Sequence, residues 1–383
     1  MSGFTRGATA IVSATTHALG EAPGFTAMEL AAGASVKALA AIGLKPRDVD
    51  AIFVALPEDP MSGLGLAEYL GVATKLTDNN RTGGSSFETH AIHAALALEA
   101  GACDVALIAY GSNQRSAAGK LITSLRPNPY EWRYRLPRPV GSYALAAARY
   151  LHCYGVTRDA FAEVAIAARR WAQLNPDAFM REELTREGYF KTRMVADPLS
   201  VRDCCLVTDG AAAIVMTRAD RARDLAARPV YLLGGAAATE HRDIAQMPDL
   251  TVTAAVHSGA RAFAQAGVRP SDLDVVELYD AFTINVLLFL EDLGFCKKGE
   301  AADFVAGGRI APGGKLAVNT NGGGLSCTHP GMYGLFTIVE AVEQLAGRAG
   351  ARQVANARLA LAHGNGGEFS SQATLVLGTA ETL

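Results

Sequence analysis

The chain carries Ala38-Leu-Ala-Ala-Ile-Gly43-Leu-Lys-Pro46-Arg-Asp48-Val-Asp50 near its beginning and repeats the pattern in its second half as Ala262-Phe-Ala-Gln-Ala-Gly267-Val-Arg-Pro270-Ser-Asp272-Leu-Asp274. In each copy, a run with the apolar spacing of a helix ends at a glycine, and a turn with proline follows. Each copy then enters a short apolar strand, at residues 51–55 or 275–278. The sequence therefore predicts one helix, turn and strand unit of the βαβ type that is used twice.

The likeness extends further along both halves. Lys75-Leu-Thr-Asp-Asn79-Asn-Arg-Thr-Gly83-Gly84 corresponds to Lys315-Leu-Ala-Val-Asn319-Thr-Asn-Gly-Gly323-Gly324, and a helix is expected after each glycine run. This duplication predicts an α/β fold with two pseudo-symmetric halves, residues 1–225 and 226–383. Residues 112–200 have no counterpart, so we expect them to form an insertion with helices near 142–155 and 158–174.

The composition limits the class of protein. Of the 383 residues, 50% are hydrophobic and 19% charged, and the 35 Lys and Arg nearly balance the 38 Asp and Glu. Such a chain can bury a large core, and it lacks the basic excess of a nucleic-acid-binding protein. The six cysteines form no C-x-x-C pair, so neither a metal site nor a disulfide framework is predicted. Because there is no secretory pattern and no apolar run of about 18 to 20 residues, we expect a cytoplasmic protein with reduced thiols and no membrane span.

Three further motifs resemble those of one family. The first, which we call the histidine string, is Asn319-Thr-Asn-Gly-Gly-Gly-Leu-Ser-Cys-Thr-His329-Pro330-Gly-Met-Tyr-Gly334. The second, the tyrosine box, is Tyr279-Asp280-Ala281-Phe282, and the third, the C-terminal box, is His363-Gly-Asn365-Gly-Gly367. Together with the duplication, they resemble the thiolase superfamily over nearly the whole chain, and most of all the sterol-carrier-protein type of thiolase. The resemblance implies a five-layered αβαβα fold.

The chain departs from this family at the catalytic cysteines. The resemblance places a nucleophilic cysteine near the glycine loop, Gly83-Gly84, which is followed here by Ser85-Ser86. The acid/base cysteine is also missing, because Ala281 and His363 occupy the two positions where family members carry it. Ser85 is the obvious substitute nucleophile, but Ser85 and Glu88 also form a capping box at a helix start, and we favour that interpretation. Cys327 is the only cysteine near the motifs and lies outside the nucleophile position.

Three side chains are candidates for catalysis. His329 precedes a run with helical apolar spacing, and the positive end of that helix favours a neutral imidazole, which either moves a proton or serves as a hydrogen-bonded structural residue. Tyr279 follows a buried strand, where its phenol either donates to an oxyanion or packs with its hydroxyl on the backbone. His363 ends the last predicted strand, as a second acid/base group or a strand-end side chain.

The insertion contributes a candidate site for coenzyme A. The segment Trp132-Arg133-Tyr134-Arg135-Leu-Pro-Arg138 mixes cations and aromatic rings, which suits phosphates and an adenine but equally suits a solvated loop. We assign Arg133 and Arg135, with Gly366 of the C-terminal box, to the binding of coenzyme A.

The leading functional hypothesis is an enzyme that makes or breaks a carbon–carbon bond in an acyl-CoA thioester, of the acyltransferase class by resemblance. One alternative is a cysteine-independent retro-aldolase that cleaves a β-hydroxyacyl-CoA of the steroid side-chain type, and another is a non-catalytic subunit that binds lipid or acyl-CoA. The coenzyme A thioester is expected as a substrate, with no bound cofactor. The resemblance also implies a homodimer and a small companion protein with a zinc ribbon and an OB-fold.

Overall fold

In the described part of the chain, ten strands of the computed structural model pair into one continuous sheet with two matching halves, and the two strands of the insertion form a small sheet of their own. The structure describes residues 3–56, 58–118 and 131–383. The strands of the first half are β1 (Thr9–Gly20), β2 (Ala51–Val54), β3 (Leu76–Asp78), β4 (Ala106–Ser112) and β7 (Asp209–Arg218). Those of the second are β8 (Val230–Thr239), β9 (Val275–Leu278), β10 (Ala317–Val318), β11 (Leu359–Gly366) and β12 (Ser371–Gly378). The spatial order β3-β2-β4-β7-β1 is repeated as β10-β9-β11-β12-β8, so the predicted duplication is confirmed.

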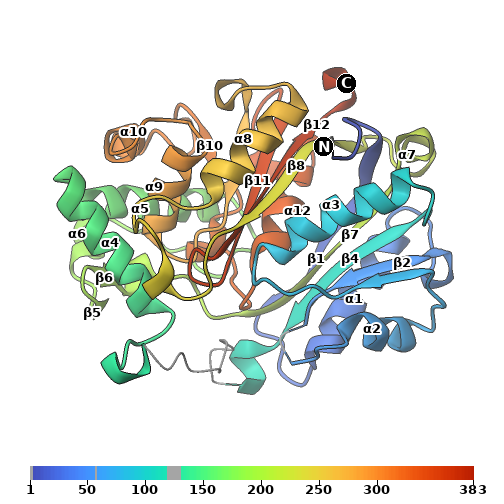
Figure 1. Cartoon of the computed structure of the whole chain (residues 1–383), viewed down its shortest axis with the longest axis horizontal. Coiled ribbons are helices and arrows are strands. Elements are labelled where there is room, and N and C mark those ends of the chain that lie inside the picture. The colour runs from blue at the N-terminus through green and yellow to red at the C-terminus, as the bar shows by residue number, and fades with distance from the viewer. Residues whose placement is uncertain (1–2, 57, 119–130) are drawn as a thin grey trace.

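The two halves meet where β1 pairs with β8 through Ala10 with Tyr231 and Ile11 with Val230. Between the halves lie α3 (Ser86–Glu99) and α12 (Gly334–Leu345), which contact strands of both. The outer faces are covered by α1 (Ala27–Ala40) and α2 (Ser62–Leu70) on the first half and by α8 (Ala255–Ala266) and α9 (Thr283–Asp292) on the second. The two halves of the sheet therefore alternate with three layers of helices, which gives the five predicted layers (Figure 1). The boundary between residues 225 and 226 stays a prediction.

The repeated motif folds in the same way in both halves. Helix α8 ends at Gly267, whose φ of 68° is the left-handed conformation that glycine adopts without strain. Asp50 accepts hydrogen bonds from the backbone N–H groups of residues 104 and 105, and Asp274 accepts the equivalent bonds from residues 358 and 359. In each half the carboxylate therefore fixes the start of a neighbouring strand beside its own.

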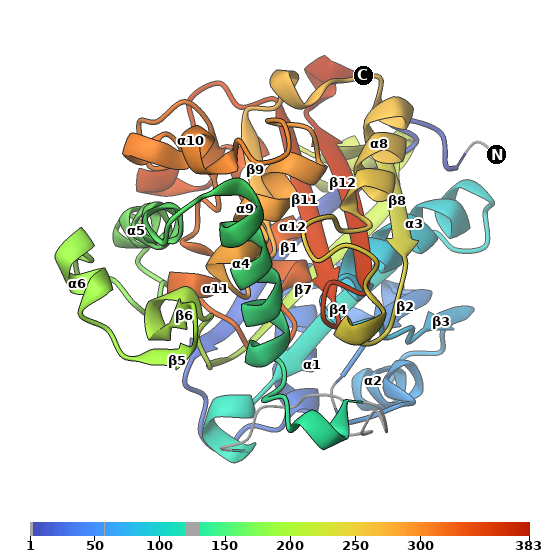
Figure 2. The same cartoon turned by 60° about the vertical axis from the view of Figure 1, so that its left-hand side comes forward.

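The insertion lies on one side of the second half. It contains α4 (Val140–Tyr154), α5 (Asp159–Gln173), α6 (Arg186–Phe190), β5 (Met194–Ala196) and β6 (Leu199–Ser200), so the two predicted helices are confirmed. Figure 2 shows these elements beside α9, α10 (Ala301–Val305) and α11 (Gly323–Ser326), which α5 contacts. Residues 119–130 of the predicted insertion lie outside the described residues. The remaining helix, α7 (Ala219–Leu225), leads from β7 toward β8.

Candidate active site

The glycine loop, the tyrosine box and the C-terminal box meet at one point. A Cβ atom on Gly84 would lie 1.9 Å from Cε2 of Tyr279 and 2.6 Å from the carbonyl oxygen of Asn365. Because no side chain fits there, glycine is required for the three segments to approach one another. Segments far apart in the sequence therefore lie together in the fold.

The histidine string folds over the end of β9. Asn319, at a φ of 54°, accepts a hydrogen bond through Oδ1 from the Leu278 N–H at 2.7 Å. Asp280 accepts the Gly324 N–H at 2.6 Å, and burial raises the pKa of this carboxyl to about 7. A Cβ on Gly324 would lie 3.0 Å from Cδ2 of His329. Asp280 thus positions the part of the string that packs against His329.

His329 is buried beside Tyr279. Its ring meets that of Tyr279 edge to face at 5.5 Å and lies parallel to that of Tyr333 at 6.0 Å. Nε2 is buried and has no hydrogen-bond partner in the described residues. Burial lowers the pKa of His329 to about 4, so the imidazole is neutral as predicted. The predicted cause is wrong, however, because α12 begins at Gly334 and not directly after His329.

Tyr279 is a neutral phenol held by backbone groups. Its hydroxyl accepts the Tyr333 N–H at 3.2 Å and donates to the Gly331 carbonyl at 3.5 Å. Burial raises its pKa, so the proton stays on the oxygen. The long bond to Gly331 is weak, which leaves the O–H able to turn toward a better acceptor. The role of Tyr279 at an oxyanion stays a prediction.

His363 lies on the opposite face from Tyr279. It pairs with Leu278 across β11 and β9, and successive residues of a strand point to opposite faces. Its Nδ1 lies 2.9 Å from Oγ1 of Thr374 and its Nε2 lies 3.0 Å from Oε1 of Gln372. The prediction that His363 ends the last strand is wrong, because it lies inside β11 and β12 follows. Its catalytic role stays a prediction, but the structure does not bring its ring together with His329.

Ser85 precedes α3 without capping it. Its hydroxyl donates to Ser371 Oγ at 2.9 Å and lies 3.0 Å from Thr82 Oγ1. The predicted capping box is wrong, because Ser85 makes no cap bond and the buried Glu88 accepts from Thr337 Oγ1 at 3.0 Å instead. In the described part of the chain, no histidine or carboxylate receives the Ser85 proton, so this hydroxyl has no activating base.

Comparison with known proteins identifies the family. Residues 236–379 match the family model described as "Thiolase C-terminal domain-like". The chain is 35% identical to the 17-hydroxy-3-oxo-4-pregnene-20-carboxyl-CoA lyase of Mycobacterium tuberculosis, over 85% of this chain and 88% of the lyase. The chain belongs to the thiolase superfamily.

Two further superfamily relatives extend this finding. The acetyl-CoA acetyltransferase of Methanothermobacter thermautotrophicus is 31% identical over 87% of this chain and 90% of that protein. The solved structure titled "Ltp2-ChsH2(DUF35) aldolase" has a TM-score of 0.90 at 30% identity and covers 99% of this chain and 100% of the other. The chain is therefore a superfamily enzyme, and the predicted class, which makes or breaks a carbon–carbon bond in an acyl-CoA thioester, is confirmed.

The predicted coenzyme A residues of this thiolase-superfamily enzyme lie in two places. Arg133 and Arg135 are exposed on the insertion. Gly366 packs against the chain itself, since a Cβ would lie 1.9 Å from the Thr82 carbonyl oxygen. Arg138 of the same segment contacts protein carboxylates, because it forms ion pairs with Glu368 and Asp243 at 2.5 and 3.0 Å. Binding of coenzyme A by Arg133, Arg135 and Gly366 stays a prediction.

Sequence analysis missed two aromatic residues of the site. Tyr333 donates to Asn321 Oδ1 at 2.9 Å and stacks on His329. Tyr143 of α4 donates to the Gly367 carbonyl at 2.9 Å, and its ring stacks on Phe282 at 4.3 Å. Tyr333 lies within the histidine string, so the sequence could have indicated that it belongs to the site. The sequence around Tyr143 gives no such indication, because its contact with Gly367 depends on how the insertion folds against the second half.

Cys327 is the only cysteine near the motifs in the sequence, but the fold brings the backbone of a second one to them. Cys327 is buried, with Asn175 Nδ2 3.5 Å from its sulfur, and burial raises the pKa of its thiol. Cys205 donates its backbone N–H to the Ala281 carbonyl of the tyrosine box at 2.8 Å. The backbone of a second cysteine, five residues beyond the insertion, therefore lies against the tyrosine box.

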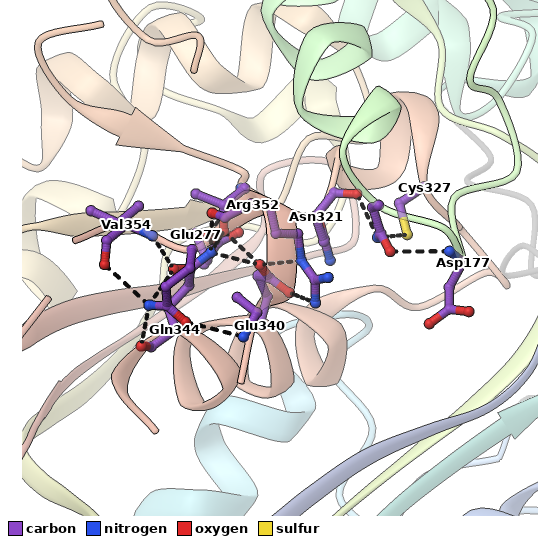
Figure 3. Close-up of polar contacts among 12 residues, drawn as sticks. Asp177, Glu277, Asn321, Cys327, Glu340, Gln344, Arg352 and Val354 are labelled. Carbon is purple, nitrogen blue, oxygen red and sulfur yellow. Dashed lines mark hydrogen bonds and ion pairs between the residues drawn. The ribbon is translucent and has the colours of Figure 1, made fainter. Parts of the chain in front are cut away.

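A buried network of polar side chains contacts the histidine string at Thr320. The Thr320 hydroxyl lies 2.8 Å from Glu277 Oε1 and 2.7 Å from Glu340 Oε1, and Arg352 donates two hydrogen bonds to Glu340 at 2.9 and 3.0 Å. Figure 3 shows these carboxyl groups beside Gln344 and Arg352. Burial and the neighbouring Glu340 raise the pKa of Glu277 well above its usual range, so it keeps its proton. Thr320 thus joins the string to β9 through neutral Glu277 and to α12 through Glu340, whose charge Arg352 compensates.

Within residues 3–56, 58–118 and 131–383, no group of three His, Cys, Asp or Glu side chains is placed to hold a metal ion. None of the helices in the same ranges combines the length and the apolar character that crossing a bilayer requires.

Proposed function

We propose that this enzyme cleaves the bond between the α and β carbons of a β-hydroxyacyl-CoA by a retro-aldol reaction, without a covalent acyl-enzyme. The observation that carries the proposal is buried His329 beside the Tyr279 phenol, because its Nε2 has no hydrogen-bond partner in the described residues and none of those residues provides Ser85 with a base. A retro-aldol cleavage needs a base and a stabilised enolate, whereas acyl transfer needs an activated nucleophile.

The two side chains have complementary chemistry. Neutral His329 accepts the proton of the β-hydroxyl group as the carbon–carbon bond breaks and the β carbon becomes a ketone. The electron pair of that bond passes to the thioester as an enolate, whose oxygen accepts a hydrogen bond from Tyr279. Both groups are buried, where such hydrogen bonds to developing charge are strongest. The enolate then needs a proton at the α carbon to give the product thioester.

Relatives support a steroid side chain as the acyl group. The lyase from Mycobacterium tuberculosis is named for a substrate with a 17-hydroxyl group on the carbon β to the thioester. Retro-aldol cleavage of that compound gives a 17-ketosteroid and propionyl-CoA. We propose the same class of substrate for this chain. Acyl transfer, the reaction named for the acetyltransferase relative, is less well supported because it needs an acyl carrier that Ser85 does not provide.

The remaining predictions belong to the same proposal. We propose that Arg133 and Arg135 bind the phosphates of coenzyme A, that the enzyme is a homodimer and that it works in the cytoplasm. The structure titled as an Ltp2-ChsH2(DUF35) aldolase supports a small companion protein. The six cysteines are all free, which suits a reducing compartment.

The test is turnover of a 17-hydroxysteroid 20-carboxyl-CoA thioester, followed as 17-ketosteroid and propionyl-CoA by mass spectrometry. We expect cleavage by the wild type and by Ser85→Ala, with no acyl mass on the intact protein, and loss of cleavage in His329→Gln. A stable acyl adduct on Ser85 would overturn the proposal in favour of acyl transfer.

A further inference from the structure

Asp280 of the tyrosine box is a buried carboxyl that the histidine string holds in place. Its side chain is fully buried. Oδ1 accepts the Gly324 N–H at 2.6 Å, and Oδ2 accepts the Leu325 N–H at 3.4 Å. A Cβ on Gly323 would lie 2.0 Å from Oδ2, so glycine is required there for the carboxyl to reach the backbone. The main chain of the string therefore fixes the carboxyl group in one position.

The same contacts place this carboxyl beside the ring of His329. A Cβ on Gly324 would lie 3.1 Å from Oδ1 of Asp280 and 3.0 Å from Cδ2 of His329, so these two atoms are within about 6 Å of each other. In an imidazole, Cδ2 is bonded to Nε2, which has no hydrogen-bond partner in the described residues. The edge of the ring that takes up a proton is therefore near Asp280, and no hydrogen bond joins the two side chains.

Asp280 is the acid in these surroundings that changes its charge near pH 7. Burial raises its pKa to about 7, against the effect of the two N–H groups. The charged groups on neighbouring elements are bonded elsewhere, because Asp203 pairs with Arg158 at 3.5 Å and Arg169 donates to Ser326 Oγ at 3.1 Å. The neighbouring acids whose pKa values burial raises, so that they stay neutral, are Glu277, Tyr279, Cys205, Cys327 and Tyr333.

Burial makes His329 a weak base in the resting enzyme, because it lowers the pKa of the imidazole to about 4. When the imidazole accepts the proton of a β-hydroxyl group, a positive charge forms in a place where burial disfavours it. An opposite charge within about 4–6 Å favours the charged form of such a group. The carboxylate of Asp280 lies at about this distance and is held there by the backbone.

We propose that Asp280 is the charge partner of His329, whose carboxylate stabilises the imidazolium that forms when Nε2 takes the proton of the β-hydroxyl group. Asp280 is thus a positioning residue that acts through His329. The inference rests on the proposed retro-aldol function and deepens it, because it names the group that lets a buried neutral imidazole act as the base.

This role gives kcat/KM a defined pH dependence. Only the ionised form of Asp280 stabilises the imidazolium, and the carboxyl ionises as the pH rises through about 7. His329 is neutral throughout this range, because its pKa is about 4. We therefore expect kcat/KM of the wild type to rise with pH through about 7 and then to reach a plateau.

The experiment measures kcat/KM for the 17-hydroxysteroid 20-carboxyl-CoA thioester from about one pH unit below this pKa to about one above it. Asp280→Asn keeps an oxygen that accepts the Gly324 N–H but carries no charge. We expect its profile to be flat and about 10- to 100-fold below the wild-type plateau. The matched control is Asp274→Asn at the other end of β9, where the carboxylate also accepts backbone N–H groups, at 2.8 and 3.0 Å. It should keep the wild-type profile.

A second measurement separates the charge of Asp280 from its contacts with the backbone. In the His329→Gln background no imidazolium forms, so the added change Asp280→Asn should alter kcat less than about twofold. A purely structural role would instead cost the same factor in both backgrounds. If Asp280→Asn does not fold, as judged by circular dichroism, the wild-type profile decides, because a rise through the pKa supports the role and a flat profile overturns it.

The outcomes separate the two hypotheses. If the wild type does not cleave the thioester, the proposed function fails and the inference fails with it. If the wild type cleaves it, but with a flat profile, with equal rates in Asp280→Asn, or with the same loss in both backgrounds, the role of Asp280 is overturned and the proposed function stands.

Discussion

His329 and Tyr279 meet edge to face, with their ring centroids 5.5 Å apart and their planes at 89°. The histidine string and the tyrosine box, which carry these residues, come together because Asp280 binds the Gly324 N–H and Tyr279 binds the Tyr333 N–H. A proton acceptor and a hydrogen-bond donor are thus fixed side by side by backbone contacts. This pair is the chemical centre of the proposed reaction.

Replacement of His329 or Tyr279 should lower kcat strongly and change KM little. We expect His329→Gln to reduce kcat about 10²- to 10⁴-fold through loss of the proton acceptor. Tyr279→Phe should reduce it about 10²- to 10³-fold through loss of the enolate donor. KM should change little, as measured with the 17-hydroxysteroid thioester. His257→Gln, at a mostly exposed histidine, is the control. Wild-type kcat in both variants would contradict the assignment.

The fold followed from the sequence because its signals are local. The repeats around Gly43 and Gly267 each encode a helix end, a turn and a strand, and such a unit folds in the same way wherever it occurs. The site was only partly predictable. His329 and Tyr279 lie in recognisable motifs, but whether His363 faced the same side depended on sheet register, which a one-residue shift reverses. Cys205 follows the insertion, and its backbone contact with Ala281 depends on the path of that long segment, which no local pattern predicts.

The exposed arginines of the insertion should affect binding and not chemistry. A charge-assisted hydrogen bond is worth about 1.5–3 kcal/mol, which corresponds to a change in affinity of roughly tenfold or more. We therefore expect Arg133→Ala and Arg135→Ala to raise KM for the acyl-CoA about tenfold and leave kcat unchanged. Arg193→Ala, another exposed arginine of the insertion, is the matched control. Equal KM values in all three variants would assign the two residues to a solvated loop.

Arg352 should be essential to stability because it compensates the charge of the buried Glu340 carboxylate. Its two hydrogen bonds to Glu340, at 2.9 and 3.0 Å, lie next to protonated Glu277. Breaking a buried ion pair by removing one partner costs about 3–5 kcal/mol. Arg352→Met should lower the free energy of unfolding by this amount in urea titrations. Arg348→Met, which removes a half-exposed pair with Glu343, should cost less than about 1 kcal/mol. Similar losses in both variants would refute this ranking.

Because of Glu88, the free energy of unfolding should decrease as the pH rises. Burial raises its pKa from 4.5 to about 8 in the folded protein. Between these values the folded chain keeps a proton that the unfolded chain has lost, so the free energy of unfolding should fall as pH rises, by up to about 1.4 kcal/mol per pH unit. The stability that neutral Glu88 contributes is fully present below pH 4.5 and is fully lost above about pH 8. In urea titrations across this range, Glu88→Gln should flatten the dependence, whereas exposed Glu68→Gln should leave it unchanged. Parallel curves for the wild type and Glu88→Gln would show that this carboxyl is ionised in the folded protein and that its buried environment supplies a compensating charge.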